Sequence, residues 1–336
     1  MTFENLAKLT HAKLVNEPAI TSFDAIVFEP EKVKMGDLFI GRDPEQVKKA
    51  LARGAYAILS DRKIPVYDEE VGWLRCENIE SALVSLLRYY LSQKTLTFVC
   101  FDPVSVALMQ KVAHRENLLF LADNIETNFH RLIDADPESI VVGSDENFIR
   151  QVYPAYTIIE PPVENSVSIF RSTLLQSSFY YREHLYENIK IPELFLPQLA
   201  KVLDFLQTHQ IPFDVHKCDY TPWFYPLFVT KRLQLKPFGT TPLTLIITKD
   251  TAMLSDVANY VRQKASWAKL LCIYPHKIDT AHCPISTTLR YRSIDEIEKL
   301  KEIEFNFAII NADPNKVVQT IKNLTKKEPQ SLFEEL

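Results

Sequence analysis

The sequence predicts an α/β protein of three domains, with parallel sheets in the central and C-terminal domains. Strand-like segments alternate with amphipathic helical segments over most of the chain, which is the order of elements in parallel sheets. The chain has 336 residues, more than one hydrophobic core usually supports. Its 46% hydrophobic and 24% charged residues are typical of globular proteins rather than disordered ones.

The first part of the chain, residues 1–94, is predicted to be a small α/β domain. Its expected elements are strands at 25–29, 37–41 and 55–60 and helices at 44–53 and 79–91. The first helix is favoured because Asp43 suits its N-cap, Pro44 its first helical position and Gly54 its end. The polar residues 92–94 mark the expected boundary.

The rest of the chain is predicted to form a central domain, 95–241, and a shortened C-terminal domain, 242–336. In the central domain the pattern predicts strands at 97–101, 118–121 and 139–142, helices at 104–115, 127–134 and 197–210, and antiparallel strands at 179–182 and 186–191. In the C-terminal domain it predicts strands at 243–248, 270–274 and 305–311 and helices at 252–264, 294–301 and 314–324.

Composition narrows the classes of function. No apolar run approaches the roughly 18 residues of a membrane span, and the first ten residues, with Glu4 among them, lack the basic and apolar regions of a signal peptide. We therefore expect a cytoplasmic protein without a membrane span. The net charge is −5, the pI is about 6.0, and no dense Lys/Arg run is present, which argues against nucleic acid as a partner.

The five cysteines indicate reduced thiols rather than a disulfide framework, because they are odd in number, scattered and free of any C-x-x-C pair. They are Cys76, Cys100, Cys218, Cys272 and Cys283. Two His/Cys pairs, His216 with Cys218 and His282 with Cys283, offer zinc-ligand chemistry. Their spacing fits no common zinc pattern, so surface histidines and buried thiols are the favoured interpretation and no metal is expected.

Glycine is scarce: the chain has 6, whereas roughly 7% of residues are glycine in an average protein. Loops that wrap phosphates need several glycines close together, because the backbone must approach the ligand without a Cβ in the way. Only Gly36 and Gly41 are close. Arg42-Asp43 follows them in place of Lys-Ser/Thr, and 38–40 is typical of a buried strand. No nucleotide cofactor is therefore expected.

Two motifs near the N-terminus resemble the first domain of the Mur ligases. They are KVKMGDLFIG at 32–41 and ALARGAYAIL at 50–59, which match a v-k-x-G-D-L-F and A-x-x-x-G-A-x-A-x-l pairing. Mur ligases are ATP-dependent enzymes that add amino acids to UDP-N-acetylmuramic acid in bacterial peptidoglycan synthesis. Within the family, the ligase that attaches D-alanyl-D-alanine is the most similar. The resemblance implies a three-domain Mur-ligase-like arrangement, here shortened.

The chain departs from the family where the chemistry is done. After the strand at 97–101 the family has G-T-N-G-K-[ST]-T, which holds the phosphates and magnesium of ATP, and this chain has DPVSV at 102–106. The family's H-N motif corresponds to 195–196 and its D-x-Y-N-A-N-P motif to TKDTAML at 248–254, with only an alanine retained.

The nucleotide-sugar motifs are altered as well. The family's D-S-R corresponds to Glu29-Pro30-Glu31, which replaces a guanidinium by a carboxylate, and its D-G-H loop is missing. Together these losses predict a non-catalytic Mur-ligase-like protein that regulates or scaffolds cytoplasmic peptidoglycan synthesis. Its expected partners are cell-wall synthesis proteins or UDP-N-acetylmuramoyl precursors. The alternatives are an active ligase with a divergent ATP site and an interaction module unrelated to the cell wall.

Two further features are candidates for a site. Asp102 and Asp250 each follow a predicted strand, where ligand sites in α/β sheets lie, and the alternative is that each caps the next helix. The run at 220–228 is rich in rigid aromatic side chains, which partner surfaces favour; the alternative is packing between domains. The candidate partner surface consists of Tyr220, Trp223, Phe224, Tyr225 and Phe228.

Overall fold

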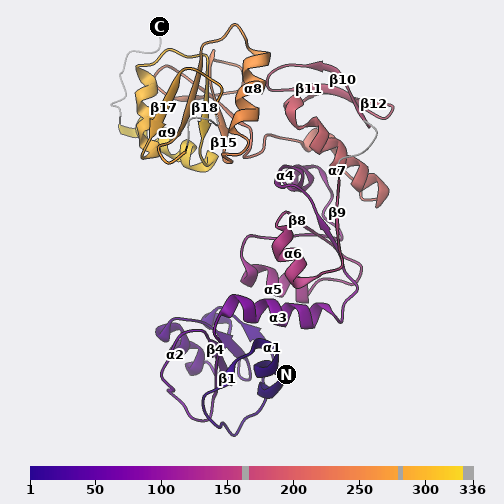
Figure 1. Ribbon diagram of the computed structural model, residues 1–336, viewed down its shortest axis with the longest axis vertical. Helices are drawn as coiled ribbons and strands as arrows, with labels where there is room; N and C mark the ends of the chain where they lie inside the picture. The colour runs from indigo at the N-terminus through magenta and orange to yellow at the C-terminus, as the bar shows by residue number, and fades with distance from the viewer. Residues whose placement is uncertain (161–165, 279–282, 328–336) are drawn as a thin grey trace. The chain divides into compact units, whose positions relative to one another are not determined.

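The computed structural model describes residues 1–160, 166–278 and 283–327 (Figure 1). The chain divides into two compact units. Unit 1 consists of Met1–Asp102 with Arg115–Ile159, and unit 2 of Pro103–His114 with Glu160–Leu336. The α/β class expected from the sequence is confirmed. The three domain boundaries stay a prediction.

Unit 1 begins with a five-stranded sheet whose strand order is β1-β5-β4-β3-β2. Strands β2 to β5 are parallel, and β1 pairs antiparallel with β5 at one edge. The elements of this part are β1 (Lys13–Leu14), β2 (Ile26–Val27), β3 (Leu38–Ile40), β4 (Ala57–Ser60), β5 (Gly72–Arg75), α1 (Phe3–Thr10), η1 (Pro30–Lys32), α2 (Pro44–Ala52) and α3 (Ile79–Leu91).

The central strands of this sheet are buried on both faces, as continuous apolar runs in parallel strands require. In β3 the side chains alternate between two clusters: Leu38 and Ile40 belong to one core and Phe39 to the other. All three residues are buried, which confirms that 38–40 is a strand and not part of a phosphate loop. Helix α2 begins at Pro44 with Asp43 as its N-cap, as predicted.

The two motifs that resemble the Mur ligases meet in this sheet. Gly36 has φ +99°, and a Cβ there would lie 2.5 Å from Asp24 Oδ2, so only glycine fits without strain. The Gly36 N–H donates to the Gly54 carbonyl at 3.1 Å, and the Asp37 carboxylate accepts from the Lys34 N–H at 2.8 Å. The motif residues therefore build the turn between β2 and β3 and place it against the end of α2.

A second sheet in unit 1 is fully parallel, with the strand order β7-β8-β6-β9. Helix α3 contacts helices α5 and α6 of this part, and Figure 1 shows α3 running between α5 and the first sheet. One hydrophobic core continues from the first sheet through α3 to the second. The elements are β6 (Thr97–Cys100), β7 (Leu118–Phe120), β8 (Ile140–Gly143), β9 (Tyr156–Ile158), α5 (Ile125–Ile133) and α6 (Glu146–Val152).

Helix α4 (Pro103–Val112) follows β6 along the chain but packs within unit 2. It contacts α7 (Leu196–Thr208), and the segment after it bonds to residues that follow α7. The His114 N–H donates to the Pro212 carbonyl at 2.9 Å, and the Asp214 N–H donates to the Val112 carbonyl at 2.8 Å. The helix ends three residues earlier than the sequence pattern predicted.

The remainder of unit 2 contains two sheets. An antiparallel sheet in the order β10-β11-β12 confirms the hairpin expected from the sequence, with its turn at 182–183. A six-stranded mixed sheet has the order β14-β13-β15-β18-β16-β17. Strand β13 pairs antiparallel with β14 and β15, and β15, β18, β16 and β17 are parallel to one another. The first strand of this sheet begins at Tyr225, whereas the C-terminal domain was expected to begin at 242. Figure 1 shows α8 beside the sheet.

These sheets and the helices around them span 167 to 327. Their bounds are β10 (Val167–Ser172), β11 (Ser177–Tyr181), β12 (His184–Ile189), η2 (Glu193–Phe195), η3 (Val215–Lys217), β13 (Tyr225–Val229), β14 (Leu235–Lys236), β15 (Leu243–Thr248), α8 (Leu254–Lys264), β16 (Leu270–Pro275), β17 (Thr288–Tyr291), η5 (Ile294–Lys301), β18 (Phe307–Asn311) and α9 (Pro314–Lys327).

Several elements differ from the sequence expectations, among them the unpredicted strands β1, β5, β13 and β17. The predicted helix at 294–301 is a 3-10 helix, opened by a capping box of Ser293 and Glu296. The sequence pattern missed β9 and α6, which are only three and seven residues long, too short to show a periodicity. Among the described residues, none of the helices combines the length and apolar character that crossing a bilayer requires.

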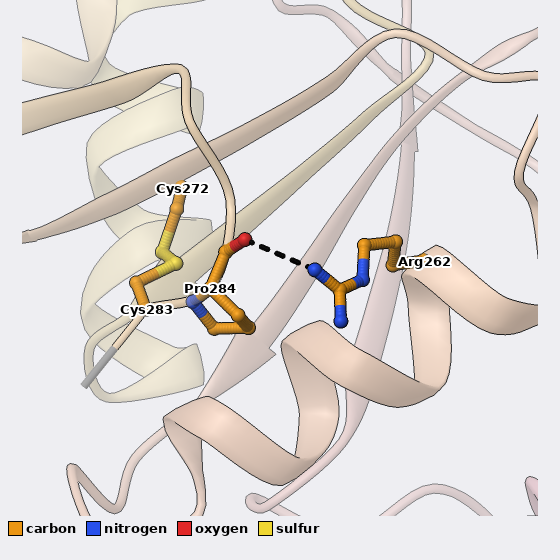
Figure 2. The surroundings of a disulfide bond; sticks show 4 residues. All are labelled: Arg262, Cys272, Cys283 and Pro284. Carbon is orange, nitrogen blue, oxygen red and sulfur yellow. Dashed lines mark hydrogen bonds between the residues drawn. A yellow bond between two sulfur atoms is a disulfide. The ribbon is translucent and has the colours of Figure 1, made fainter. Parts of the chain in front are cut away.

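The expectation that all cysteines are reduced is wrong for two of them. Cys272 and Cys283 form a disulfide, drawn in Figure 2 beside Arg262 and Pro284. The two Cα atoms are 6.8 Å apart although the residues are 11 positions apart in sequence. The disulfide brings Cys283 back beside strand β16, and the Arg262 side chain donates to the carbonyl of the next residue, Pro284, at 3.4 Å. The spacing of the cysteines in the sequence does not predict that these two residues are close together.

Candidate ligand-binding cavity

A cavity with a volume of about 590 Å³ lies in unit 1. It lies at the carboxyl ends of β7 and β8, where α/β sheets place their ligands. Its lining comes from the segments that follow these strands, from the first turns of α3 and α5, and from Arg42 after β3. The lining residues are Arg42, Ile79, Glu80, Leu83, Val84, Leu121, Ala122, Asp123, Asn124, Ile125, Glu126, Asn128, Ser144, Asp145, Phe148 and Gln151.

Short capping sequences shape this end of the sheet. Asn124 begins α5 by accepting from the Glu126 N–H at 2.7 Å, and Asp145 begins α6 by accepting from the Phe148 N–H at 3.0 Å. Asn78 does the same for α3 through the Ser81 N–H at 2.9 Å. Side chains of the protein thus already occupy N–H groups at three helix N-termini, groups that bind anions in phosphate sites.

A buried amide fixes one wall of the cavity. Asn128, in α5, is 1% exposed. Its Oδ1 accepts from the Ala122 N–H and its Nδ2 donates to the Ala122 carbonyl, both at 2.8 Å. This paired bond holds the segment after β7 against α5, so the cavity wall does not depend on an exposed loop.

The charge of the lining is acidic. It contains the carboxylates of Glu80, Asp123, Glu126 and Asp145 and the single guanidinium of Arg42. Glu80 and Glu126 lie in first helical turns, where carboxylates also stabilise the helix dipole. A cavity of this charge disfavours phosphates and favours ligands that present hydroxyl, amide or amino groups.

The guanidinium of Arg42 is already paired. Its Nε donates to Asp61 Oδ1 at 2.9 Å and its Nη2 to Asp61 Oδ2 at 2.9 Å. Burial opposes ionisation of Asp61, but the hydrogen bonds from Arg42 and from the Ile79 N–H outweigh it and hold the pKa of Asp61 below its usual value. The hydrogen bond to Asp61 likewise raises the pKa of Arg42. Arg42 therefore offers little free positive charge to a ligand.

The candidate acids from the sequence lie outside this cavity. Asp102 is half-buried in unit 1 and is not one of the lining residues. Asp250 lies in unit 2, where its Oδ1 accepts from the Ala252 N–H at 2.9 Å in the turn before α8. The N-cap of α8 is Met253, which makes no side-chain cap bond, so Asp250 stabilises the preceding turn and does not cap the helix. A ligand role for either acid stays a prediction.

The aromatic run lies inside unit 2. Trp223 is buried under Lys249, whose ammonium is 4.0 Å from the ring centroid, and Phe224 is fully buried against Phe195. The exposed fractions of Tyr220 and Phe228 are 9% and 8%. Tyr225, which is half-buried, begins β13. The packing alternative describes these positions, and a contact with a partner stays a prediction.

One other polar cluster has a structural explanation. Ser172 donates to Glu193 Oε2 at 2.5 Å, and Lys264 contacts both residues. The bonds from Lys264 and Ser172 lower the pKa of Glu193. The serine proton is held by a carboxylate and the ammonium is paired, so the cluster links β10, η2 and α8 and does not activate a nucleophile.

No metal site is found where the zinc alternative placed one. Cys283 is bonded to Cys272, Cys218 is buried, and His282 lies outside the described residues. Over the residues described, no group of three or more His, Cys, Asp or Glu side chains is arranged to hold a metal ion.

Sequence reasoning missed the cavity, although a signal was present. Asp123-Asn124 follows the strand expected at 118–121, and Ser144-Asp145 follows the one expected at 139–142. Polar residues directly after neighbouring parallel strands meet at one sheet edge. The same rule pointed to Asp102 after the strand expected at 97–101. If it is also applied to the strands at 118–121 and 139–142, it predicts this cavity.

The chain is similar to solved Mur ligase structures. No family model and no curated protein matches its sequence. MurF from Acinetobacter baumannii is 10% identical, with a TM-score of 0.57 over 97% of this chain and 99% of that one. The ADP complex of the MurF ligase from Thermotoga maritima is 12% identical, with a TM-score of 0.54 over 90% and 98%. The similarity predicted from the N-terminal motifs is thereby confirmed for the fold.

Proposed function

We propose that this chain is a non-catalytic Mur-ligase-like protein that binds a precursor or a partner of cytoplasmic peptidoglycan synthesis, in a regulatory or scaffolding role. The observation that carries the proposal is the short passage from β6 to α4. The strand ends at Cys100 and the helix begins at Pro103, so Phe101 and Asp102 are the whole connection.

This connection lacks the parts of a phosphate loop. A phosphate loop uses several backbone N–H groups and flexible glycines to surround the anion. Here Pro103 has no N–H, and Asp102 adds a negative charge. The Ser105 side chain, which falls within the stretch aligned with the family loop, is 0% exposed. A hydroxyl in that position does not reach magnesium in solvent, which supports the loss of ATP-dependent ligation.

The acid-lined cavity is the candidate binding site for the precursor. A UDP-N-acetylmuramoyl peptide carries amide and hydroxyl groups, which carboxylates accept from, as well as a diphosphate, which they repel. We therefore expect the cavity to take the sugar or peptide portion. Its volume of about 590 Å³ is within the usual range for small-molecule sites.

The test is a thermal-shift and calorimetric titration of the full chain with a UDP-N-acetylmuramoyl peptide and, separately, with ATP and magnesium. A ligand that binds only the folded state adds about 2.7 kcal/mol of stability at a concentration 100 times its Kd. We expect the precursor to stabilise the chain and ATP to leave it unchanged. Micromolar binding of ATP together with ligase turnover would overturn the proposal in favour of the active-ligase alternative.

A variant pair locates the binding. Asp123 is an exposed acid in the lining, so Asp123→Asn removes a charge from the cavity without breaking a bond that shapes it. Glu116→Gln removes an equally exposed charge of unit 1 outside the cavity. Weaker precursor binding in the first variant alone assigns the ligand to the cavity.

A further inference from the structure

A second hollow in unit 1 has the opposite charge to the acid-lined cavity. It has a volume of about 260 Å³ and shares no residue with that cavity. Its lining also excludes residues 29–31, which correspond to the D-S-R motif of the Mur ligases. We call it the basic hollow. Its lining residues are Val15, Ile58, Ser60, Arg62, Lys63, Ile64, Pro65, Val66, Trp73, Leu74 and Arg75.

The apolar part of the basic hollow is rigid. Ile58 and Trp73 are register partners on the parallel strands β4 and β5 and are 1% and 4% exposed. The Trp73 Nε1–H donates to the Asp68 carbonyl at 2.8 Å, and the Tyr67 ring lies edge-on to the indole at 5.9 Å. These two buried side chains form a fixed base beneath the accessible lining residues Val15, Ile64 and Val66.

The polar part is a group of cations without acidic partners. Arg62, Lys63 and Arg75 are exposed, and in the described part of the chain their side chains form no hydrogen bond or ion pair. Lys13 on β1 is the register partner of Arg75 across the antiparallel pair, so two like charges face each other, which destabilises a sheet.

The acids near this group are engaged elsewhere or only flank it. Asp61 is bonded to Arg42, and Asp68 accepts from the Glu70 N–H at 2.9 Å. Glu69 and Glu70 are exposed and lie between Val66 and Trp73 in sequence. None of these carboxylates is paired with a cation of the basic hollow, so the positive charge there is uncompensated.

We propose that the basic hollow binds a small organic phosphate. The phosphate meets Arg62, Lys63 and Arg75, and an apolar group rests on the accessible lining side chains Val15, Ile64 and Val66. A dianion balances three cations better than a monoanionic carboxylate does, and guanidinium groups match phosphate oxygens in pairs. A volume of about 260 Å³ equals roughly nine water volumes of 30 Å³, the size of a phosphate with one small ring.

The experiment titrates the full chain by calorimetry with three probes: phenyl phosphate, inorganic phosphate and benzyl alcohol. We expect saturable binding of phenyl phosphate, weaker binding of inorganic phosphate and none of the uncharged alcohol, because both the charge and the apolar contact contribute. Equal binding of phenyl phosphate and benzyl alcohol overturns the proposal, as does the absence of saturable phenyl phosphate binding at millimolar concentration.

Variants tie the binding to this group of cations. The double variant Arg62→Gln with Arg75→Gln is expected to weaken phenyl phosphate binding by about tenfold or more, because each charge-assisted bond to phosphate is strong. Lys63→Glu repels the probe and tests the third cation. The control is Lys34→Gln, an exposed cation of unit 1 outside the hollow. Unchanged affinity in the double variant, with its thermal unfolding intact, overturns the assignment.

Discussion

The paired hydrogen bond between Asn128 and Ala122 makes the candidate cavity directly testable. Asn128→Ala removes both bonds and leaves the N–H and the carbonyl of Ala122 without their protein partner. Asn128→Asp keeps an oxygen that accepts from the N–H but brings a carboxylate against the carbonyl oxygen. Alanine is favoured over aspartate in a helix interior by roughly 0.7 kcal/mol, so helix propensity opposes the loss expected for Asn128→Ala and does not account for it.

The expected cost follows from the number of bonds and their burial. A net hydrogen bond contributes about 1 kcal/mol, and a buried polar group left unsatisfied costs about 1–3 kcal/mol. Ala122 is half-buried, so water replaces part of what is lost. We therefore expect Asn128→Ala to lower the local opening free energy by about 2–3 kcal/mol. Asn128→Asp should lower it by at least as much, because its carboxylate would lie at a position that is 1% exposed and would face the Ala122 carbonyl oxygen.

Hydrogen exchange is the suitable assay because a chain with two compact units does not unfold in one step. A loss of 2–3 kcal/mol corresponds to amide exchange about 30- to 150-fold faster over 118–133. Asn147→Ala, on the exposed side of α6, is the control and should leave this segment unchanged. Unaltered protection in Asn128→Ala would refute the view that the amide holds the cavity wall.

Three further predictions concern other parts of the chain. Burial first, and then the carboxylate of Asp204, raises the pKa of Tyr181 from 10.0 to about 12. Its stabilisation is therefore complete below pH 10 and lost as the pH rises through 12, and Tyr181→Phe should flatten the stability profile in that window when unfolding is measured against pH. Thiol titration of the unfolded, unreduced chain should find three free thiols, and five after reduction; closing this loop by the disulfide contributes about 3 kcal/mol, and five thiols without reductant would contradict the bond. Gly36→Ala forces a Cβ to within 2.5 Å of Asp24 Oδ2 at positive φ and should cost about 1–3 kcal/mol in urea unfolding, more than Gly239→Ala, where the added Cβ meets open space.

The N-terminal motifs identified the fold because they are structural. Gly36 is required by its positive φ, Asp37 by its bond to the Lys34 N–H, and Gly54 by its position against Met35. These constraints are local in sequence, so a single sequence reveals them. The same locality explains why the motifs carry no information on catalysis: none of these contacts requires a ligand.

The sequence DPVSV at 102–106 was also enough to predict that the family's phosphate loop is missing. The strand expected at 97–101 and the helix expected from 104 follow from apolar periodicity, and the structure has them at Thr97–Cys100 and Pro103–Val112. The short connection follows from their closeness. The structure added the burial of Ser105. It also placed α4 with α7 in unit 2 rather than with the sheet that precedes it, which periodicity does not specify.

The exposed or buried state of the aromatic run depended on distant segments. Its rigid side chains suit a partner surface or a core equally well. Phe195 and Lys249, both far from the run in sequence, cover its rings. The residue pattern within 220–228 does not predict which distant residues pack against it.

The sequence by itself determined the α/β class, most helices and strands, the fold family and the lack of a phosphate loop, because each depends on periodicity, caps or glycines within a short stretch. Only the tertiary structure decided which polar residues share a cavity, which cations lack a partner, which aromatics are buried and which two cysteines meet. These properties depend on distances between segments far apart in the chain, such as β1 with β5 and β16 with Cys283, and those distances are set by packing rather than by local pattern.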